Sequence, residues 1–218
     1  MPHRSLRLLA VFTLAPLSLG ACQTAAYSIQ ESLLGNEKRD ILVDRVAGVA
    51  KEQTEAKEEF EDALEAFRAV VDVDAGNLER TYDDLKAAYK RADSQAGTVR
   101  SRVASVKRVS RDLFAEWEGE LAQYQDAGLR RASEQQLQDT RLRYDELAAK
   151  MDAATDSMDP VLRVFNDRVL FLKHNLNARA IASLDGETAQ LEGDVSRLIA
   201  EMERSIAAAD AFIAQMRA

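Results

Sequence analysis

The fold is decided by residues 42–70, LVDRVAGVAKEQTEAKEEFEDALEAFRAV, in which mostly apolar side chains recur at alternating steps of four and three residues. The series is Leu42, Val46, Val49, Gln53, Ala56, Phe60, Ala63, Phe67 and Val70. The positions between them are mostly charged. A 3.5-residue repeat sustained over four heptads is typical of a coiled-coil seam. We therefore expect one helix that packs along its length against other helices.

Three further series continue this pattern, and short polar segments separate them. The series run from Leu78 to Tyr124, from Leu137 to Leu176 and from Ile181 to Met216. The separating segments are DVDAGN at 72–77, DAG at 126–128 and KHNLNARA at 173–180. They are rich in residues that favour turns and helix ends, and Asn77 is placed to cap the second helix.

Four helical segments of similar length with short connections predict antiparallel neighbours. We therefore expect an all-α fold, an elongated antiparallel four-helix bundle or coiled-coil-like rod, over residues 37–218. A single seam, or three helices with part of the chain splayed, is the alternative. Pro160 should kink the third helix or make it restart with Asp159 as its cap. Gly186 and Gly193 should weaken the fourth helix without breaking it.

Charge patterning supports the first reversal of the chain. Residues 51–65 hold seven acids against two lysines, and residues 86–111 hold eight bases against Asp93. A turn near residue 75 would bring the two stretches together, so we expect them to pair within one hairpin. The alternative is a stripe that binds an anionic polymer or lipid head group, formed by Arg100, Arg102, Lys107, Arg108 and Arg111.

The N-terminus has the form of an export signal. A basic start precedes the apolar run LLAVFTLAPLSL at 8–19, which is too short to span a bilayer. It leads into Gly20, Ala21 and Cys22, which resembles the lipobox of bacterial lipoproteins, whose cysteine thiol is diacylated and whose signal peptide is then cut in front of that cysteine. We therefore expect a lipoprotein signal peptide at 1–21, lipidation at Cys22 and a lipidated tether at 22–36. An ordinary signal followed by a free thiol is the alternative.

Location and charge narrow the classes of partner. Gln23 follows the cysteine, and the resemblance to Gram-negative lipoproteins implies anchoring in the inner leaflet of the outer membrane, facing the periplasm. No later apolar run is long enough to cross a bilayer. Removal of residues 1–21 deletes Arg4 and Arg7 and no acid, so the net charge falls from −8 to −10. This acidity opposes nucleic-acid binding, which depends on neutralising phosphates.

Catalytic patterns are missing from the mature chain. It holds one histidine, His174, and one cysteine, Cys22, too few for a Glu-x-x-His di-metal centre, a zinc site or a catalytic thiol. G-x-S-x-G and glycine-rich phosphate loops are also missing. We therefore expect no enzyme, no cofactor and no metal. A carboxylate-dependent cell-wall hydrolase is the weaker alternative.

The predicted topology gathers two turns at the end far from Cys22. Their polar residues are Asp72, Asp74, Asn77, His174, Asn175 and Asn177. Such residues are ordinary caps and turn formers, and the alternatives are a docking tip for a partner or a metal site at Asp72, Asp74 and His174. The opposite end, with Arg130 and Arg131, would face the membrane, where arginines can contact phosphate groups.

Four strings in the chain resemble a known family. They are KRDILVDRV at 38–46, LRRASEQQL at 129–137, LKHNLNARAIASL at 172–184 and DVSRLIAEMERSI at 194–206. They resemble the bacterial lipoproteins catalogued as domain of unknown function 2959 (DUF2959). The resemblance covers essentially the whole mature chain and implies a lipoprotein with a helical body. It implies no catalytic residues.

These patterns predict a membrane-anchored periplasmic lipoprotein that acts as a structural spacer or as an adaptor for another envelope protein. The alternative is a module that binds peptidoglycan, lipopolysaccharide or a divalent cation. Homo-oligomerisation is left open, because heptad faces can also pair between chains.

Overall fold

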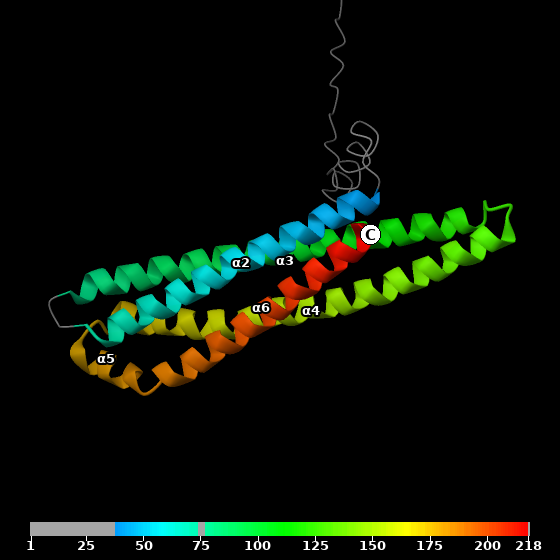
Figure 1. The fold of residues 1–218 in the computed structure, drawn as a ribbon. Coiled ribbons are helices and arrows are strands. Elements are labelled where there is room, and N and C mark those ends of the chain that lie inside the picture. The colour runs from blue at the N-terminus through cyan, green and yellow to red at the C-terminus, as the bar shows by residue number, and fades with distance from the viewer. Residues whose placement is uncertain (1–37, 74–76, 218) are drawn as a thin grey trace, which may run out of the picture. The chain divides into compact units, whose positions relative to one another are not determined.

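The computed structural model describes residues 38–73 and 77–217, which form five helices and no strand. They are α2 (Lys38–Val71), α3 (Leu78–Leu121), α4 (Ala127–His174), α5 (Ala178–Asp185) and α6 (Thr188–Arg217) (Figure 1). The chain divides into two units, Met1–Asn36 and Glu37–Ala218. The expected signal peptide, Cys22 and the tether lie outside the described residues. None of the five helices is long and apolar enough to cross a membrane.

The four long helices form a closed ring of neighbours. α2 packs against α3 and α6, and α4 packs against the same two helices. Each of the three main connections reverses the chain, so neighbours in the ring run antiparallel (Figure 1). The all-α bundle is therefore confirmed, and the three-helix alternative is wrong.

The seam of α2 lies at the centre of the ring. All nine positions of the series from Leu42 to Val70 have no exposed surface. Phe60 and Phe67 are among the largest fully buried side chains, and burial of such a side chain contributes about 1.5–3 kcal/mol. Gln53 lies in the same buried seam, and its side-chain amide nitrogen and oxygen form no hydrogen bond with the described residues. The apolar phase of the sequence thus fixes which face of α2 is buried.

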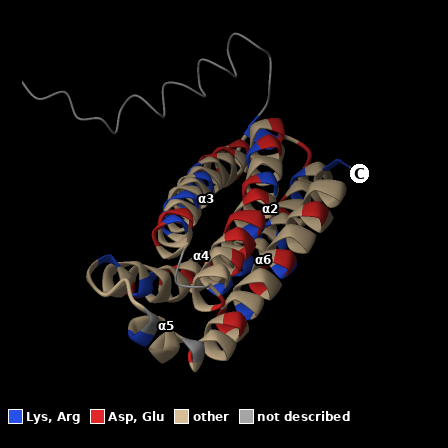
Figure 2. Ribbon diagram, turned by 90° about the vertical axis from the view of Figure 1, so that its left-hand side faces the viewer, with Lys and Arg blue, Asp and Glu red and all other residues tan. Residues whose placement is uncertain are grey.

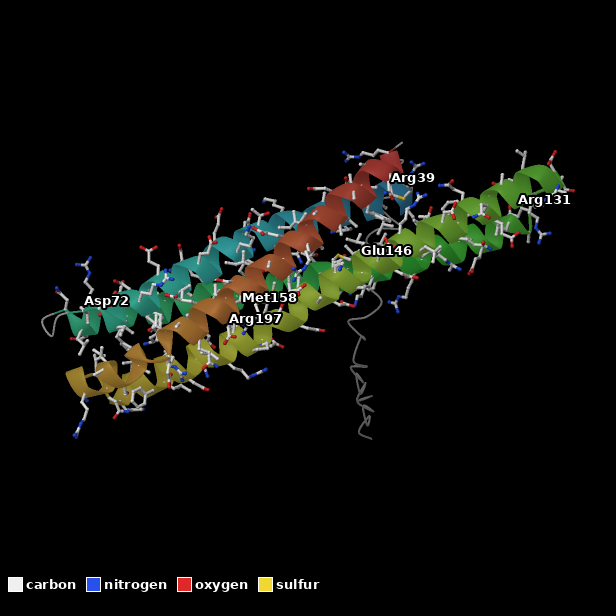
Figure 3. The ribbon with its side chains drawn as sticks, turned by 60° about the horizontal axis from the view of Figure 1, so that its bottom comes forward. Arg39, Asp72, Arg131, Glu146, Met158 and Arg197 are labelled. Atoms are coloured by element: carbon white, nitrogen blue, oxygen red, sulfur yellow. The ribbon has the colours of Figure 1, made fainter. Side chains whose placement is uncertain are left out.

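The helices differ in length, and the longer pair projects beyond the shorter one. α2 and α6 have 34 and 30 residues, whereas α3 and α4 have 44 and 48. α2 begins at Lys38, whose Nζ lies 2.7 Å from Glu116 Oε1 of α3. Beyond that level α3 and α4 continue as a two-helix arm, residues 117–137 (Figure 1). In Figure 3, Arg131 of the arm lies beyond Arg39 and at the opposite end from Asp72.

Pro160 does not interrupt α4, so the expected restart with Asp159 as a cap is wrong. The helix runs unbroken from Ala127 to His174, and the Asp159 carboxylate forms an ion pair with Arg100 of α3. Pro160 is exposed while Met158 and Val161 beside it are buried. Water can therefore bond the carbonyl that lacks its helical N–H, and core packing holds the helix on both sides.

The fourth segment does break, contrary to the expectation for Gly186. α5 ends at Asp185, and Gly186 donates its N–H to the Leu184 carbonyl oxygen. Glu187 then forms an ion pair with Arg168 of α4, and α6 begins at Thr188. The weak helix former and this long-range pair together end the helix. α5 packs against α2, with Ile181 and Leu184 buried as their phase predicts.

Candidate functional site

The predicted pairing between α2 and α3 is present in the structure. Arg91 Nε lies 2.8 Å from Glu59 Oε2, and its Nη2 lies 3.3 Å from Asp62 Oδ2. The hydrogen bond with Glu59 raises the pKa of Arg91. Arg102 Nη2 lies 3.2 Å from Glu52 Oε1. Acidic residues are prominent along α2 (Figure 2), and part of the basic stretch of α3 lies against them.

The five bases of the predicted stripe do not act as one surface. Arg102 turns to α2, but Arg100 pairs with Asp159 of α4, and Lys107 Nζ lies 2.5 Å and 2.6 Å from the two oxygens of Asp152. Arg108 and Arg111 form no ion pair with the residues described. The structure therefore separates three bases that stabilise the bundle from two that form no ion pair with the part of the chain described.

Arg108 and Arg111 line a groove of about 690 Å³ between α3 and α4. Its cations are Lys107, Arg108, Arg111 and Arg141, and its carboxylates are Asp145 and Asp152. The rest of the lining is Ala104, Ser110, Phe114, Tyr144 and Ala148. The volume lies within the range of small-molecule sites, and apolar walls with a few convergent polar groups are typical of them.

Aromatic contacts fix the floor of the groove. The rings of Phe114 and Tyr144 meet edge to face at 5.5 Å between centroids, and Tyr144 meets Phe212 of α6 at 6.3 Å. The Arg141 guanidinium lies over the Phe114 ring at 5.2 Å from its centroid. Such contacts limit side-chain motion, so the groove is largely preformed.

The protonated and cationic side chains in the groove act as hydrogen-bond donors. Burial raises the pKa of Tyr144, although Ser110 and Lys107 oppose the shift, so its hydroxyl keeps its proton at neutral pH. Arg141 Nη1 lies 2.5 Å from Glu118 Oε1 and lowers the pKa of that carboxyl. Lys107 and Arg141 are paired, so the groove charges that form no ion pair within residues 38–73 and 77–217 are Arg108, Arg111 and the opposing Asp145. The groove can therefore hold a small anion through hydrogen bonds without a metal ligand set.

The described residues of the predicted tip lie at one end of the bundle, but Asn175 and Asn177 have structural roles there. The C-terminal end of α2, the N-terminal end of α3 and the α4–α5 connection lie at the same end (Figure 1). Asn175 Nδ2 donates to the Phe171 carbonyl oxygen at 2.9 Å, and Asn177 Oδ1 caps α5 by accepting from Ala180 N at 3.1 Å. Asn77 forms no side-chain cap at the start of α3, which corrects that expectation.

The remaining tip residues supply little that could bind a ligand. Asp72 and His174 are exposed, and Asp74 lies outside the described residues. No group of three or more His, Cys, Asp or Glu side chains that could hold a metal occurs among residues 38–73 and 77–217.

Sequence reasoning missed Arg141 and a set of exposed apolar side chains. Arg141 flanks the Thr140 and Tyr144 seam positions, and only the packing of α4 against α3 brings it to the groove. The exposed apolar residues are Tyr124, Leu129, Leu142, Leu170 and Phe171. Four of them fall outside the heptad phase, which was the one signal that could have marked them as unburied.

Residues 26–216 match the family model described as "Protein of unknown function (DUF2959)". No curated protein and no solved structure matches the chain.

Proposed function

The chain belongs to the DUF2959 family, and we propose that it is a non-enzymatic, lipid-anchored helical protein of the bacterial cell envelope that acts as an adaptor between a membrane and a partner protein. In this proposal the partner protein docks at the arm, residues 117–137.

The anchor half of the proposal is supported by the sequence around Cys22. The run Leu19-Gly20-Ala21-Cys22 follows a short apolar segment and has the form of a lipobox. Two or three acyl chains on one cysteine give stable attachment, whereas a single chain does not. The 16 residues from Cys22 to Glu37 can reach on the order of 50 Å when extended, which limits the distance from the membrane to the start of α2.

The adaptor half is carried by one observation, the apolar side chains left exposed where four helices become two. Tyr124 and Leu129 are 41% and 61% exposed on the arm, and Leu142 just beyond it is 65% exposed. Helical bundles bury such side chains against further helices. Residues 117–137 also carry Glu118, Glu120, Asp126 and Glu134 against Arg130 and Arg131. The arm therefore fits an amphipathic partner helix with basic flanking residues.

The experiment is photo-crosslinking in intact cells with the full chain. A crosslinker at Leu129 should capture one discrete protein, and the same group at Asn175 on the opposite end should not. Capture of a second copy of this chain at Leu129, or equal capture at both positions, would reject the arm as an adaptor surface.

The anchor is tested separately by cell fractionation. Cys22→Ser should remove the chain from the membrane fraction and abolish its labelling with acyl chains. Unchanged labelling with a palmitate analogue would reject lipidation at Cys22, whatever the arm binds.

A further inference from the structure

The groove between α3 and α4 collects positive charge on an acidic protein. The whole chain has a net charge of −8, yet four cations and two carboxylates line this groove. Arg108 and Arg111 are three residues apart, which places them on one face of α3. Arg141 reaches the same groove from α4, so cationic groups border it from both helices.

The carboxylates in the groove limit what it can accept. Asp152 is neutralised by Lys107 through both of its oxygens. Asp145 forms no ion pair with the described residues and opposes any anion that enters. A long polyanion would meet Asp145 as well as the arginines, whereas a compact anion can contact the two guanidiniums alone. The lining therefore favours a single small anionic group over an extended polymer.

We propose that this groove binds the phosphate group of a phosphate ester through the guanidiniums of Arg108 and Arg111. Guanidinium groups present planar pairs of donors that match phosphate oxygens. Tyr144 lies in the same lining, whereas the buried Ser110 hydroxyl donates to the Lys107 carbonyl oxygen, and Ala104, Phe114 and Ala148 supply apolar surface for the esterified carbon chain. This site goes beyond the adaptor function and does not depend on the partner that docks at the arm.

Two sources can supply this chemistry, a phospholipid head group and a small free phosphate ester. The groove residues from Lys107 to Phe114 lie close along α3 to Glu116, which marks the level where α2 begins. Anchoring at Cys22 would bring that level within the reach of the tether, so the lipid source is compatible with the anchored protein.

The test uses the purified full chain in neutral detergent. Methyl phosphate is titrated by NMR, and native mass spectrometry records the binding of phosphatidylglycerol, with phosphatidylcholine as the comparison lipid. Binding of methyl phosphate indicates a free ester as the ligand class, and binding of phosphatidylglycerol alone indicates the head group. In either case, Arg108→Glu or Arg111→Glu should weaken binding at least about tenfold, and added salt should weaken it further.

Two further variants keep the test independent of folding defects. Asp145→Asn removes the opposing charge and should strengthen binding several-fold. Arg179→Glu, an equal change of charge at an exposed residue of α5, should leave binding unchanged. The proposal is overturned if neither phosphate compound binds, if the Arg108 and Arg111 variants bind as well as the unmodified chain, or if Asp145→Asn fails to strengthen binding.

Discussion

The body of the bundle, where α2, α3, α4 and α6 lie side by side, and the arm share one apolar phase but differ in how deeply they bury it. In α3, Val99 and Val106 have no exposed surface, whereas Trp117 and Leu121 are half-buried and Tyr124 is exposed. The sequence spacing is the same in both regions. The difference is that α2 and α6 cover the body and no described residue of either covers the arm. Periodicity therefore decides which face of a helix is apolar, and the number of neighbouring helices decides whether that face is buried.

The largest effect should come from truncating the centre of the body. Phe60→Ala removes a ring with no exposed surface and should lower the free energy of unfolding by about 3–5 kcal/mol. Tyr124→Ala in the arm should lower it by about 0.5 kcal/mol or less, as expected for an exposed side chain. Urea unfolding followed by far-UV circular dichroism measures both. Equal losses would show that the arm is buried in solution, as it would be in an arm-to-arm dimer.

A second substitution in the body should stabilise the protein. Gln53 is fully buried in the α2 seam, and its side-chain amide has no hydrogen-bond partner among the described residues. Gln53→Leu removes this unpaired polar group and should raise the free energy of unfolding by about 1–3 kcal/mol. Analytical ultracentrifugation on the same samples checks the association state, because a buried polar residue in a heptad can also select the number of helices. A loss of stability would mean that the amide is bonded in solution.

Most of the fold could be predicted because heptad spacing is a local signal. The spacing of Leu42 to Val70 gave the buried face of α2, and the segments DVDAGN and KHNLNARA gave two of the reversals. The arm could not be predicted, since it depends on the unequal lengths of helices that are distant in sequence. The break at Gly186 escaped for a similar reason, because Arg168 of α4 pairs with Glu187 across the bundle.

The candidate site was predictable only in part. The five bases of the predicted stripe cannot be told apart by their spacing in the sequence, and their different roles depend on which carboxylates lie opposite them. They are Arg100, Arg102, Lys107, Arg108 and Arg111. Asp152 and Asp159 of α4 form ion pairs with Lys107 and Arg100, and the spacing of residues within α3 does not predict these pairs. Arg141 enters the groove only through the register of α4 against α3.

In the arm, one hydrogen bond should have a measurable local effect. Trp117 Nε1 donates to Ser133 Oγ at 2.8 Å and links the two arm helices. Trp117→Phe keeps an aromatic ring but removes the donor, which should cost about 0.5–1.5 kcal/mol. Hydrogen exchange at amides within 117–137 should accelerate several-fold, while amides of the body in α2 keep their protection. Equal acceleration in body and arm would show that the two regions unfold as one unit and would remove the distinction between them.

The smallest effect concerns the ion pair at the base of the arm. Arg141 hydrogen-bonds Glu118 and lowers its pKa below the ordinary value of 4.5. The folded arm therefore binds a proton at this carboxyl less readily than the unfolded chain. The stabilisation is present above the ordinary pKa and is lost as the pH falls through the lowered value.

Carboxyl NMR should show Glu118 titrating below 4.5, and Arg141→Ala should return it to that value. The Arg141 and Glu118 side chains are 37% and 53% exposed, so solvent screens the pair and the melting temperature should hardly change. A normal titration in the unmodified chain would mean that solvent separates the two groups, leaving Arg141 free to join Arg108 and Arg111 at the groove.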